Sequence, residues 1–334
     1  MSNLLEVYKL SKYFPVRSGL FNREKKYVYA VDDISFSVGN HETLGLVGES
    51  GCGKSTASRT ILNLLTPTSG EVWFQGKNMF EMHPRERRKL RQGIQIIFQD
   101  PFGSLNPRLT VERIVEEPLL SHGIGDRISR KQEVEKTLSE VGLLPEHMKR
   151  FPHEFSGGQR QRIMLARALI LKPRLIIADE PVSALDVSVQ AKMLNLMLRL
   201  QKQFELSYIF VSHDLGVIRH VSHKVAVMYL GEIVELAPVK SLYATPLHPY
   251  TRSLLSSVPI PDPHKKNRKK VILQGDVPSP RNPPPGCRFH TRCPECMDIC
   301  SSKKPPARQI EDGHIVSCHL HSAGEIWSPP APDR

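Results

Sequence analysis

The sequence predicts an α/β protein with a parallel sheet at its core and a smaller C-terminal extension. An apolar run at residues 43–47 leads through a glycine-rich loop into residues 56–65, which have helical spacing. A second apolar run, residues 174–178, ends in two acids, as expected where a buried strand reaches the edge of a parallel sheet. Eight prolines fall between Pro259 and Pro285, so long regular elements are not expected there.

The glycine-rich loop is a complete G-x-x-x-x-G-K-S phosphate loop. With the threonine that follows, it consists of Gly48, Glu49, Ser50, Gly51, Cys52, Gly53, Lys54, Ser55 and Thr56. Glycines let backbone N–H groups face a phosphate at a helix N-terminus, while Lys54 adds positive charge and Ser55 a hydroxyl for Mg²⁺. Cys52 fills a variable position and is expected to have no chemistry. A chance glycine-rich turn would not explain the flanking strand and helix, so the motif predicts a nucleotide hydrolase.

The second apolar run delivers two carboxylates with different expected roles. Asp179 is expected to hold the Mg²⁺ shell and to contribute to ATP binding. Glu180, one residue further on, is placed to polarise the attacking water as a general base. Taken alone, a strand followed by Asp-Glu is a weak signal, because acidic residues end many strands.

A second anion-binding helix terminus lies between these two sites. Ser156, Gly157, Gly158 and Gln159 open the helical pattern of residues 161–170. Because one chain rarely needs two such sites for one triphosphate, the second is expected to serve a nucleotide held by another subunit. Ser-Gly-Gly-Gln just upstream of the Asp-Glu strand resembles the signature of the ATP-binding cassette (ABC) ATPases.

Other motifs of that family follow in the family's order. Gln99 matches the Q-loop, residues 183–186 match the D-loop that ends in Asp186, and His213 matches the switch histidine. Individually, His213 could be a surface histidine and Gln99 a solvated glutamine, but six motifs in order make coincidence negligible. The resemblance implies a head-to-tail dimer with two ATP molecules at the interface.

The resemblance also implies roles for individual residues. Gln99 would join Ser55 and Asp179 around Mg²⁺ and would act in catalysis with Glu180 and His213. Those expected to reach the partner's ATP in trans are Ser156, Gly157, Gly158, Gln159 and Asp186. Phe14 is the expected adenine-stacking aromatic, with Tyr13 as the alternative, and either could instead be a core residue.

The chain divides by composition into two expected domains. Residues 1–240 would form the nucleotide-binding domain, with alternating runs such as 31–38 in an antiparallel β subdomain beside a RecA-like core. The polar helical segment 130–142 ends at a glycine, and the resemblance makes about 100–165 the helical subdomain. Residues 241–334 would form a cysteine-rich extension.

Charge and hydropathy limit the location of the chain. The net charge is +12, with basic runs at residues 85–91 and 265–270 that suit an anionic membrane surface or nucleic acid and do not decide between them. No apolar stretch approaches the roughly 18 to 20 residues needed to span a bilayer, and the N-terminus lacks a signal peptide. The chain is therefore expected to be a soluble or peripheral cytoplasmic protein, and the resemblance to transporter ATPases implies peripheral binding at the cytoplasmic face of the cell membrane.

Five of the six cysteines lie in the extension, and they predict a metal or cluster site. They are Cys287, Cys293, Cys296, Cys300 and Cys318. A disulfide framework is not expected in a cytoplasmic protein. Structural zinc usually shows paired C-x₂-C knuckles and only Cys293 with Cys296 forms one, whereas thiolates alone in a loop-rich segment also suit an iron–sulfur cluster. Zinc and iron–sulfur both remain open on these residues.

Three further segments narrow the resemblance to the ATPase subunits of bacterial dipeptide and oligopeptide importers. They are residues 99–110, residues 248–255 with 258–262, and residues 286–293. The resemblance implies a second, related ATPase subunit, two membrane permeases and an extracytoplasmic peptide-binding protein. It also implies a 4Fe-4S cluster on Cys287, Cys293, Cys300 and Cys318, with Cys296 extra to the pattern. The insertion at residues 16–26 resembles the second of the two paired ATPases.

Two alternatives to peptide import remain. The same machinery could import nickel or another small solute, since the ATPase carries no pocket for the cargo. A cassette ATPase acting on nucleic acid would bind it through the basic runs. Such relatives typically carry two cassettes in one chain or a long coiled-coil insertion. Neither is present in this sequence, so no nucleic-acid partner is expected.

Overall fold

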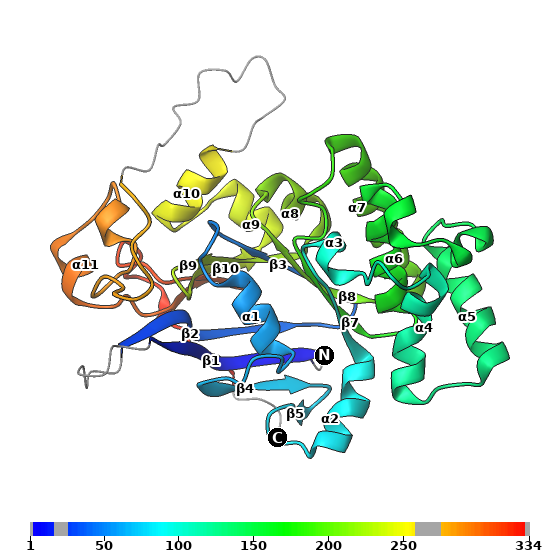
Figure 1. The fold of residues 1–334 in the computed structure, drawn as a ribbon. Coiled ribbons are helices and arrows are strands. Elements are labelled where there is room, and N and C mark those ends of the chain that lie inside the picture. Colours follow the sequence, from blue (N-terminus) through cyan, green and yellow to red (C-terminus); the bar gives the residue numbers. More distant parts are fainter. Residues whose placement is uncertain (1–2, 17–25, 258–274, 331–334) are drawn as a thin grey trace. The chain divides into compact units, whose positions relative to one another are not determined.

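The computed structural model describes residues 3–16, 26–257 and 275–330 (Figure 1). Three segments named above therefore lie outside the described residues: residues 17–25 of the insertion, residues 258–262 and the basic run 265–270. The chain forms two compact units. Unit 1 contains Met1–Val38, Thr43–Glu81 and Ser212–Arg334, and unit 2 contains Gly39–Glu42 and Met82–Val211.

Unit 1 contains the expected antiparallel sheet. Its strands are β1 (Leu5–Val16), β2 (Lys26–Val38), β4 (Ser69–Phe74) and β5 (Lys77–Asn78), in the order β2-β1-β4-β5. The strand expected at residues 31–38 forms the second half of β2, and β1 pairs with it in antiparallel register from Leu5 opposite Val38. Leu5, Val7 and Leu10 of β1 are buried, so one face of this sheet contributes to the core.

A second set of strands in unit 1 carries the phosphate loop. In spatial order they are β3 (Thr43–Val47), β9 (Lys224–Tyr229), β10 (Glu232–Pro238), β12 (His314–Val316), β11 (Arg308–Glu311) and β13 (Glu325–Ile326). Strand β3 is buried along its whole length and runs parallel to β9, whereas the remaining pairs are antiparallel. The parallel strand expected at residues 43–47 is confirmed.

Helix α1 (Lys54–Ile61) follows the phosphate loop and packs against β1 and β2. The sequence predicts helix to residue 65, and this boundary is wrong. Asn63 adopts a left-handed conformation (φ 53°), and the N–H groups of Leu64 and Leu65 both bond to the carbonyl of Arg59. Asparagine tolerates that conformation, so it ends the helix although the apolar pattern continues.

Short helices complete unit 1. They are α8 (Leu215–Val221), α9 (Val239–Ala244), α10 (Pro249–Ser256), α11 (Asp298–Ser302) and the 3₁₀ turn η5 (His290–Arg292). No described helix downstream of the proline-rich stretch is longer than the five residues of α11, in agreement with the composition.

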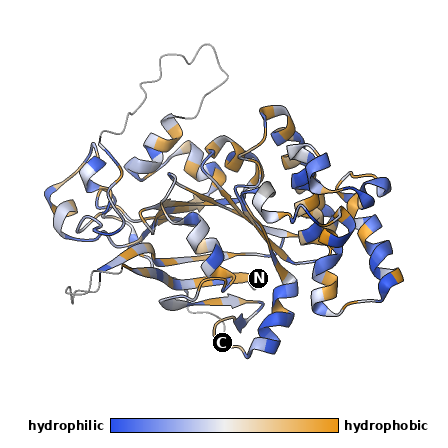
Figure 2. Ribbon diagram, viewed as in Figure 1, coloured by the Kyte–Doolittle hydropathy of each residue, from blue (hydrophilic) through white to orange (hydrophobic). Residues whose placement is uncertain are grey.

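Unit 2 combines a parallel sheet with most of the helices. Strands β6 (Ile94–Ile97), β7 (Leu175–Asp179) and β8 (Ser207–Ser212) pair in parallel, and every residue of β7 and β8 is buried. In Figure 2 the strands at the centre are mostly hydrophobic, whereas the helices alternate between hydrophobic and hydrophilic residues. A parallel strand covered on both faces requires such a sequence, which confirms the strand expected before Asp179.

The helices of unit 2 follow their sequence patterns closely. They are α2 (Pro84–Leu90), α3 (Pro101–Ser104), α4 (Val111–His122), α5 (Arg127–Glu140), α6 (Gly157–Leu169) and α7 (Val187–Phe204), with 3₁₀ turns η1 (Arg91–Gly93), η2 (Pro145–Lys149) and η3 (Pro152–Glu154). Helix α5 starts at a capping box made by Asp126 and Ser129 and ends two residues before Gly142 (φ 75°). Helix α4 packs on α5 and α6.

The architecture is that of an α/β protein, as the sequence predicts. Within the described ranges, no helix is both long and apolar enough to cross a membrane. The domain boundary at residue 240 and the limits of the helical subdomain at about 100–165 stay predictions.

Candidate functional site

The phosphate loop in unit 1 has the geometry its motif requires. Gly48 (φ 155°) and Gly53 (φ 109°) lie so close to other backbone that a Cβ would come within 2.1 Å of the Met228 carbonyl oxygen and 2.0 Å of the Ala30 carbonyl oxygen. Only glycine fits at these two positions. The side chain of Lys54 is buried, and its Nζ donates to the carbonyl oxygens of Gly48 at 2.7 Å and Glu49 at 3.0 Å.

Neighbouring loop residues play supporting roles. Ser55, the last residue of the loop motif, and Thr56 lie in the first turn of α1. Cys52 is buried, and burial raises the pKa of its thiol. Its carbonyl accepts a hydrogen bond from the N–H of Gly231 at 2.8 Å. Cys52 is therefore held by packing and by this backbone bond, and its lack of a chemical role stays a prediction.

The two carboxylates of unit 2 differ in exposure and in partners. Asp179 is the buried last residue of β7, and Glu180 follows it with a left-handed backbone (φ 48°). The Glu180 N–H bonds to the Val211 carbonyl at 3.0 Å, and the Ser183 hydroxyl donates to the Glu180 carbonyl at 3.1 Å. Gln99 Nε2 donates to Glu180 Oε2 at 2.8 Å. The structure thus joins the expected Q-loop residue directly to the expected general base.

The signature and D-loop residues lie at two neighbouring helix N-termini in unit 2. Ser156 caps α6 in a reciprocal capping box, in which its backbone N–H bonds to Gln159 Oε1 at 3.0 Å. Asp186 caps α7, and the hydrogen bond from the Val189 N–H lowers the pKa of its carboxyl. A Cβ on Gly158 would lie 2.5 Å from Val189 Cγ1, so glycine allows the start of α6 to approach α7.

The remaining nucleotide-site candidates lie in unit 1. His213 is exposed immediately after β8, and Asp214 beside it caps α8 by accepting from the Gly216 N–H at 2.7 Å. Exposure is compatible with contact to a ligand, and the role of His213 stays a prediction.

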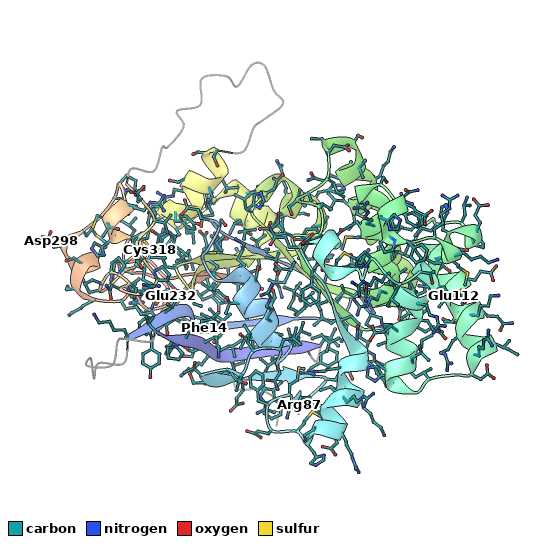
Figure 3. The ribbon with its side chains drawn as sticks, in the orientation of Figure 1. Phe14, Arg87, Glu112, Glu232, Asp298 and Cys318 are labelled. Carbon is teal, nitrogen blue, oxygen red and sulfur yellow. The ribbon has the colours of Figure 1, made fainter. Side chains whose placement is uncertain are left out.

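The two adenine-stacking candidates have different partners in unit 1. The Tyr13 hydroxyl bonds to Asp32 Oδ1 at 2.5 Å, and the Tyr13 ring packs 4.8 Å from that of Tyr29. Burial and this hydrogen bond raise the pKa of Tyr13 to about 12. Phe14 is half-exposed near the end of β1, with Lys12 Nζ 4.9 Å from its ring centre (Figure 3). Tyr13 and Phe14 are both half-buried, and the choice of Phe14 as the adenine-stacking residue stays a prediction.

The cysteines of the extension gather in one region of unit 1. Cys300 and Cys318 are buried, Cys296 is exposed, and the Cys287 N–H donates to the Cys300 carbonyl at 2.8 Å. Burial, with smaller contributions from neighbouring cysteines, raises the pKa of Cys287 to about 12 and that of Cys293 to about 11. All six cysteines are free of disulfides. A cation bound among these thiols would lower their pKa values and stabilise the thiolate forms.

The side-chain positions of the cysteines do not form a ready metal site. In the described part of the chain, no group of three or more histidine, cysteine, aspartate or glutamate side chains is arranged to hold a metal ion. The thiols therefore lie within electrostatic range of one another without the spacing of bound ligands. The donor set fits a cluster chemically, and the 4Fe-4S cluster stays a prediction.

One contact to the phosphate loop has no counterpart in the sequence analysis. Arg292 and Tyr250, both in the C-terminal part of unit 1, hydrogen-bond to Glu49 of the loop. Arg292 is separated from Glu49 by 243 positions, and no spacing in the sequence predicts that they meet.

Comparison with known proteins identifies relatives of both parts of the chain. Residues 31–183 match the ABC transporter family model, and residues 234–300 match the model of the oligopeptide/dipeptide transporter C-terminal region. The oligopeptide transport ATP-binding protein AppF of Bacillus subtilis is 53% identical over 96% of this chain and 98% of its own length. A probable peptide ABC transporter ATP-binding protein, y4tS of Sinorhizobium fredii, is 50% identical over 96% of this chain and 90% of its own.

Solved structures show the same cassette fold. The ATP-binding cassette MJ0796, solved as a dimer bound to ADP and phosphate, is 28% identical with a TM-score of 0.62, covering 70% of this chain and 98% of its own. The protein cbiO1 of Clostridium perfringens, part of the ABC transporter complex cbiONQ, is 25% identical with a TM-score of 0.62, covering 73% of this chain and 92% of its own. The chain belongs to the ATP-binding subunits of ABC transporters, in the group that carries the oligopeptide/dipeptide transporter C-terminal region.

Proposed function

We propose that this chain hydrolyses ATP to power the import of dipeptides or oligopeptides through a membrane ABC transporter. The observation that carries the proposal is the 53% identity to an oligopeptide transport ATP-binding protein over 96% of the chain. The match to the oligopeptide/dipeptide C-terminal region supports it independently of the cassette. These relatives favour peptide over nickel or another small solute as the cargo.

The proposed chemistry assigns a role to each motif side chain. The loop N–H groups and Lys54 hold the phosphates of ATP, and Phe14 stacks on the adenine. Ser55, Asp179 and Gln99 hold Mg²⁺, which when bound neutralises charge on the phosphates. Glu180 accepts a proton from the attacking water, and His213 contacts the γ-phosphate. The hydrogen bond from Gln99 to Glu180 supports this assignment, because it orients the proposed base.

The second proposal is that catalysis requires two cassettes. Ser156, Gly158 and Gln159 lie at a helix N-terminus, and the positive end of the helix dipole suits phosphate. With Gly157 and Asp186, they would contact ATP held by the phosphate loop of a partner cassette. ATP binding then closes the dimer and hydrolysis reopens it, which drives the permeases. A related but distinct ATPase is the proposed partner, in a heterodimer.

A 4Fe-4S cluster is proposed for Cys287, Cys293, Cys300 and Cys318. The gathering of these thiols in a region with little regular structure supports it, because a bound cluster would supply folding energy there. Cys296 is exposed and is proposed to be a spare thiol. A zinc ion is the alternative occupant.

The proposed assembly contains two permeases and an extracytoplasmic peptide-binding protein. The chain would bind the permeases at the cytoplasmic face of the membrane as a peripheral subunit. The proposed division places the nucleotide-binding domain at residues 1–240 and the importer extension at residues 241–334.

Uptake in cells tests the proposed cargo. Cells that lack this chain are supplied with the wild type, with Glu180→Gln, or with Glu135→Gln, which makes the same chemical change at an exposed position of α5. Wild type and Glu135→Gln should restore uptake of an isotope-labelled tetrapeptide, and Glu180→Gln should not. Restored nickel uptake without peptide uptake would refute the cargo assignment.

A further inference from the structure

An arginine of the C-terminal extension contacts the phosphate loop. Arg292 lies in η5, between Cys287 and Cys293, and it forms a two-pronged ion pair with Glu49 of the loop. Nη1 donates to Glu49 Oε2 at 2.8 Å and Nη2 donates to Oε1 at 3.1 Å. The arginine side chain is 7% exposed, and its guanidinium lies 6.0 Å from the ring centre of Tyr229. A bidentate, largely buried pair of this kind fixes both partners.

The backbone of the same loop residue is held by a second group from the extension. The Glu49 N–H donates to the hydroxyl of Tyr250 at 2.9 Å. Tyr250 belongs to α10 and is fully buried, with its ring 4.7 Å from that of Tyr229 and 5.4 Å from that of Phe289. The side chain and the backbone of Glu49 are therefore both fixed by residues outside the cassette motifs.

These contacts also affect Lys54, the residue expected to bind the phosphates. Lys54 Nζ bonds to the Glu49 carbonyl oxygen at 3.0 Å, so the position of Glu49 helps to set the position of the loop lysine. Glu49 also introduces a carboxylate into a loop that has to accept an anion. An unpaired carboxylate there would repel ATP, and the guanidinium of Arg292 neutralises it.

We propose that Arg292 is a positioning residue for ATP, which holds Glu49 and cancels its charge so that the phosphate loop accepts the nucleotide. Tyr250 supports the same residue from its backbone side. The extension is thereby a working part of the nucleotide site. This inference rests on the proposed ATP hydrolysis and adds residues that the cassette motifs do not include.

A series of substitutions at Arg292 tests the proposal on the full chain purified with its partner subunits. Arg292→Gln should raise the Kd for Mg-ATP about tenfold, which corresponds to about 1.4 kcal/mol, and should change KM far more than kcat. Arg292→Lys should fall between it and the wild type, because it keeps the charge and loses the two-pronged geometry. Arg281→Gln, at an exposed position of the extension, is the matched control and should bind ATP as the wild type does.

The double variant separates neutralisation from simple loss of structure. Adding Glu49→Gln to Arg292→Gln removes the unpaired carboxylate and should return the Kd to within about threefold of the wild type. A double variant as weak as Arg292→Gln, or an Arg292→Gln variant with wild-type ATP affinity, would overturn the proposal. If Arg292→Gln does not fold, Arg292→Lys decides, because the loss of the two-pronged geometry should still raise the Kd for Mg-ATP above that of the wild type. Wild-type protein that binds no ATP would instead overturn the proposed function.

Discussion

His248 should make the stability of unit 1 sensitive to mild acid. It is almost completely buried beside Phe289, and its Nδ1 caps α10 by accepting from the Tyr250 N–H at 3.1 Å. Its Nε2 has no hydrogen-bond partner within the described residues. Burial lowers the pKa of His248 to about 4, with His321 and Arg252 acting in the same direction and Glu235 opposing.

The sign and size of the effect follow from linkage. The unfolded chain binds a proton on His248 near pH 6.5, whereas the folded protein does so only near pH 4. The contribution of His248 to the free energy of unfolding is therefore constant well above pH 6.5 and decreases as the pH drops between these two values. At about 1.4 kcal/mol per pH unit, acidification to pH 5 removes about 2 kcal/mol.

His248→Asn is the informative variant. Asparagine keeps a side-chain acceptor at the helix N-cap but does not titrate, so its pH dependence should lack this contribution. Urea unfolding at pH 7 and pH 5, followed by the fluorescence of Trp73 and Trp327 in unit 1, measures the difference. The wild type should lose about 2 kcal/mol more than the variant on acidification. Equal losses in the two proteins would refute the burial argument.

Three other predictions concern catalysis and the cysteines. Glu180→Gln should bind ATP normally but hydrolyse it about 10² to 10⁴ times more slowly, as measured by phosphate release, and near-wild-type turnover would show that it is not the base. ATPase activity per chain should fall on dilution as dimers separate, and constant activity with no dimer in light scattering would contradict a shared site built with Ser156. Cys293→Ser should lower the iron content of anaerobically purified protein and Cys296→Ser should not; colourless protein with about one zinc per chain would support zinc instead.

Local motifs account for what the sequence predicts correctly. The strand at residues 43–47, the loop and the start of α1 form one continuous segment, so their geometry depends on neighbouring residues and glycine placement. The capped start of α6 at Ser156 is likewise encoded within a few residues. The end of α1 was not predictable from periodicity, because the left-handed conformation of Asn63 overrides an apolar pattern that continues beyond it.

Long-range contacts account for what the sequence does not predict. The bond between Gln99 and Glu180 joins residues 81 positions apart, and the pair formed by Arg292 and Glu49 joins residues 243 positions apart. Each is produced by the packing of separate elements rather than by any spacing. The motifs identify Gln99 and Glu180 individually, whereas Arg292 belongs to no nucleotide-binding motif and becomes visible only in the folded chain.

Peptide transport by the reconstituted complex tests the central claim most directly. The chain is assembled with its partner ATPase and permeases in lipid vesicles, and the uptake of a labelled oligopeptide delivered by the peptide-binding protein is measured with and without ATP. The account predicts uptake that requires ATP, proceeds with the wild-type chain and is lost with Glu180→Gln. Uptake that continues at the wild-type rate with Glu180→Gln, or ATP hydrolysis that moves no peptide, would contradict it.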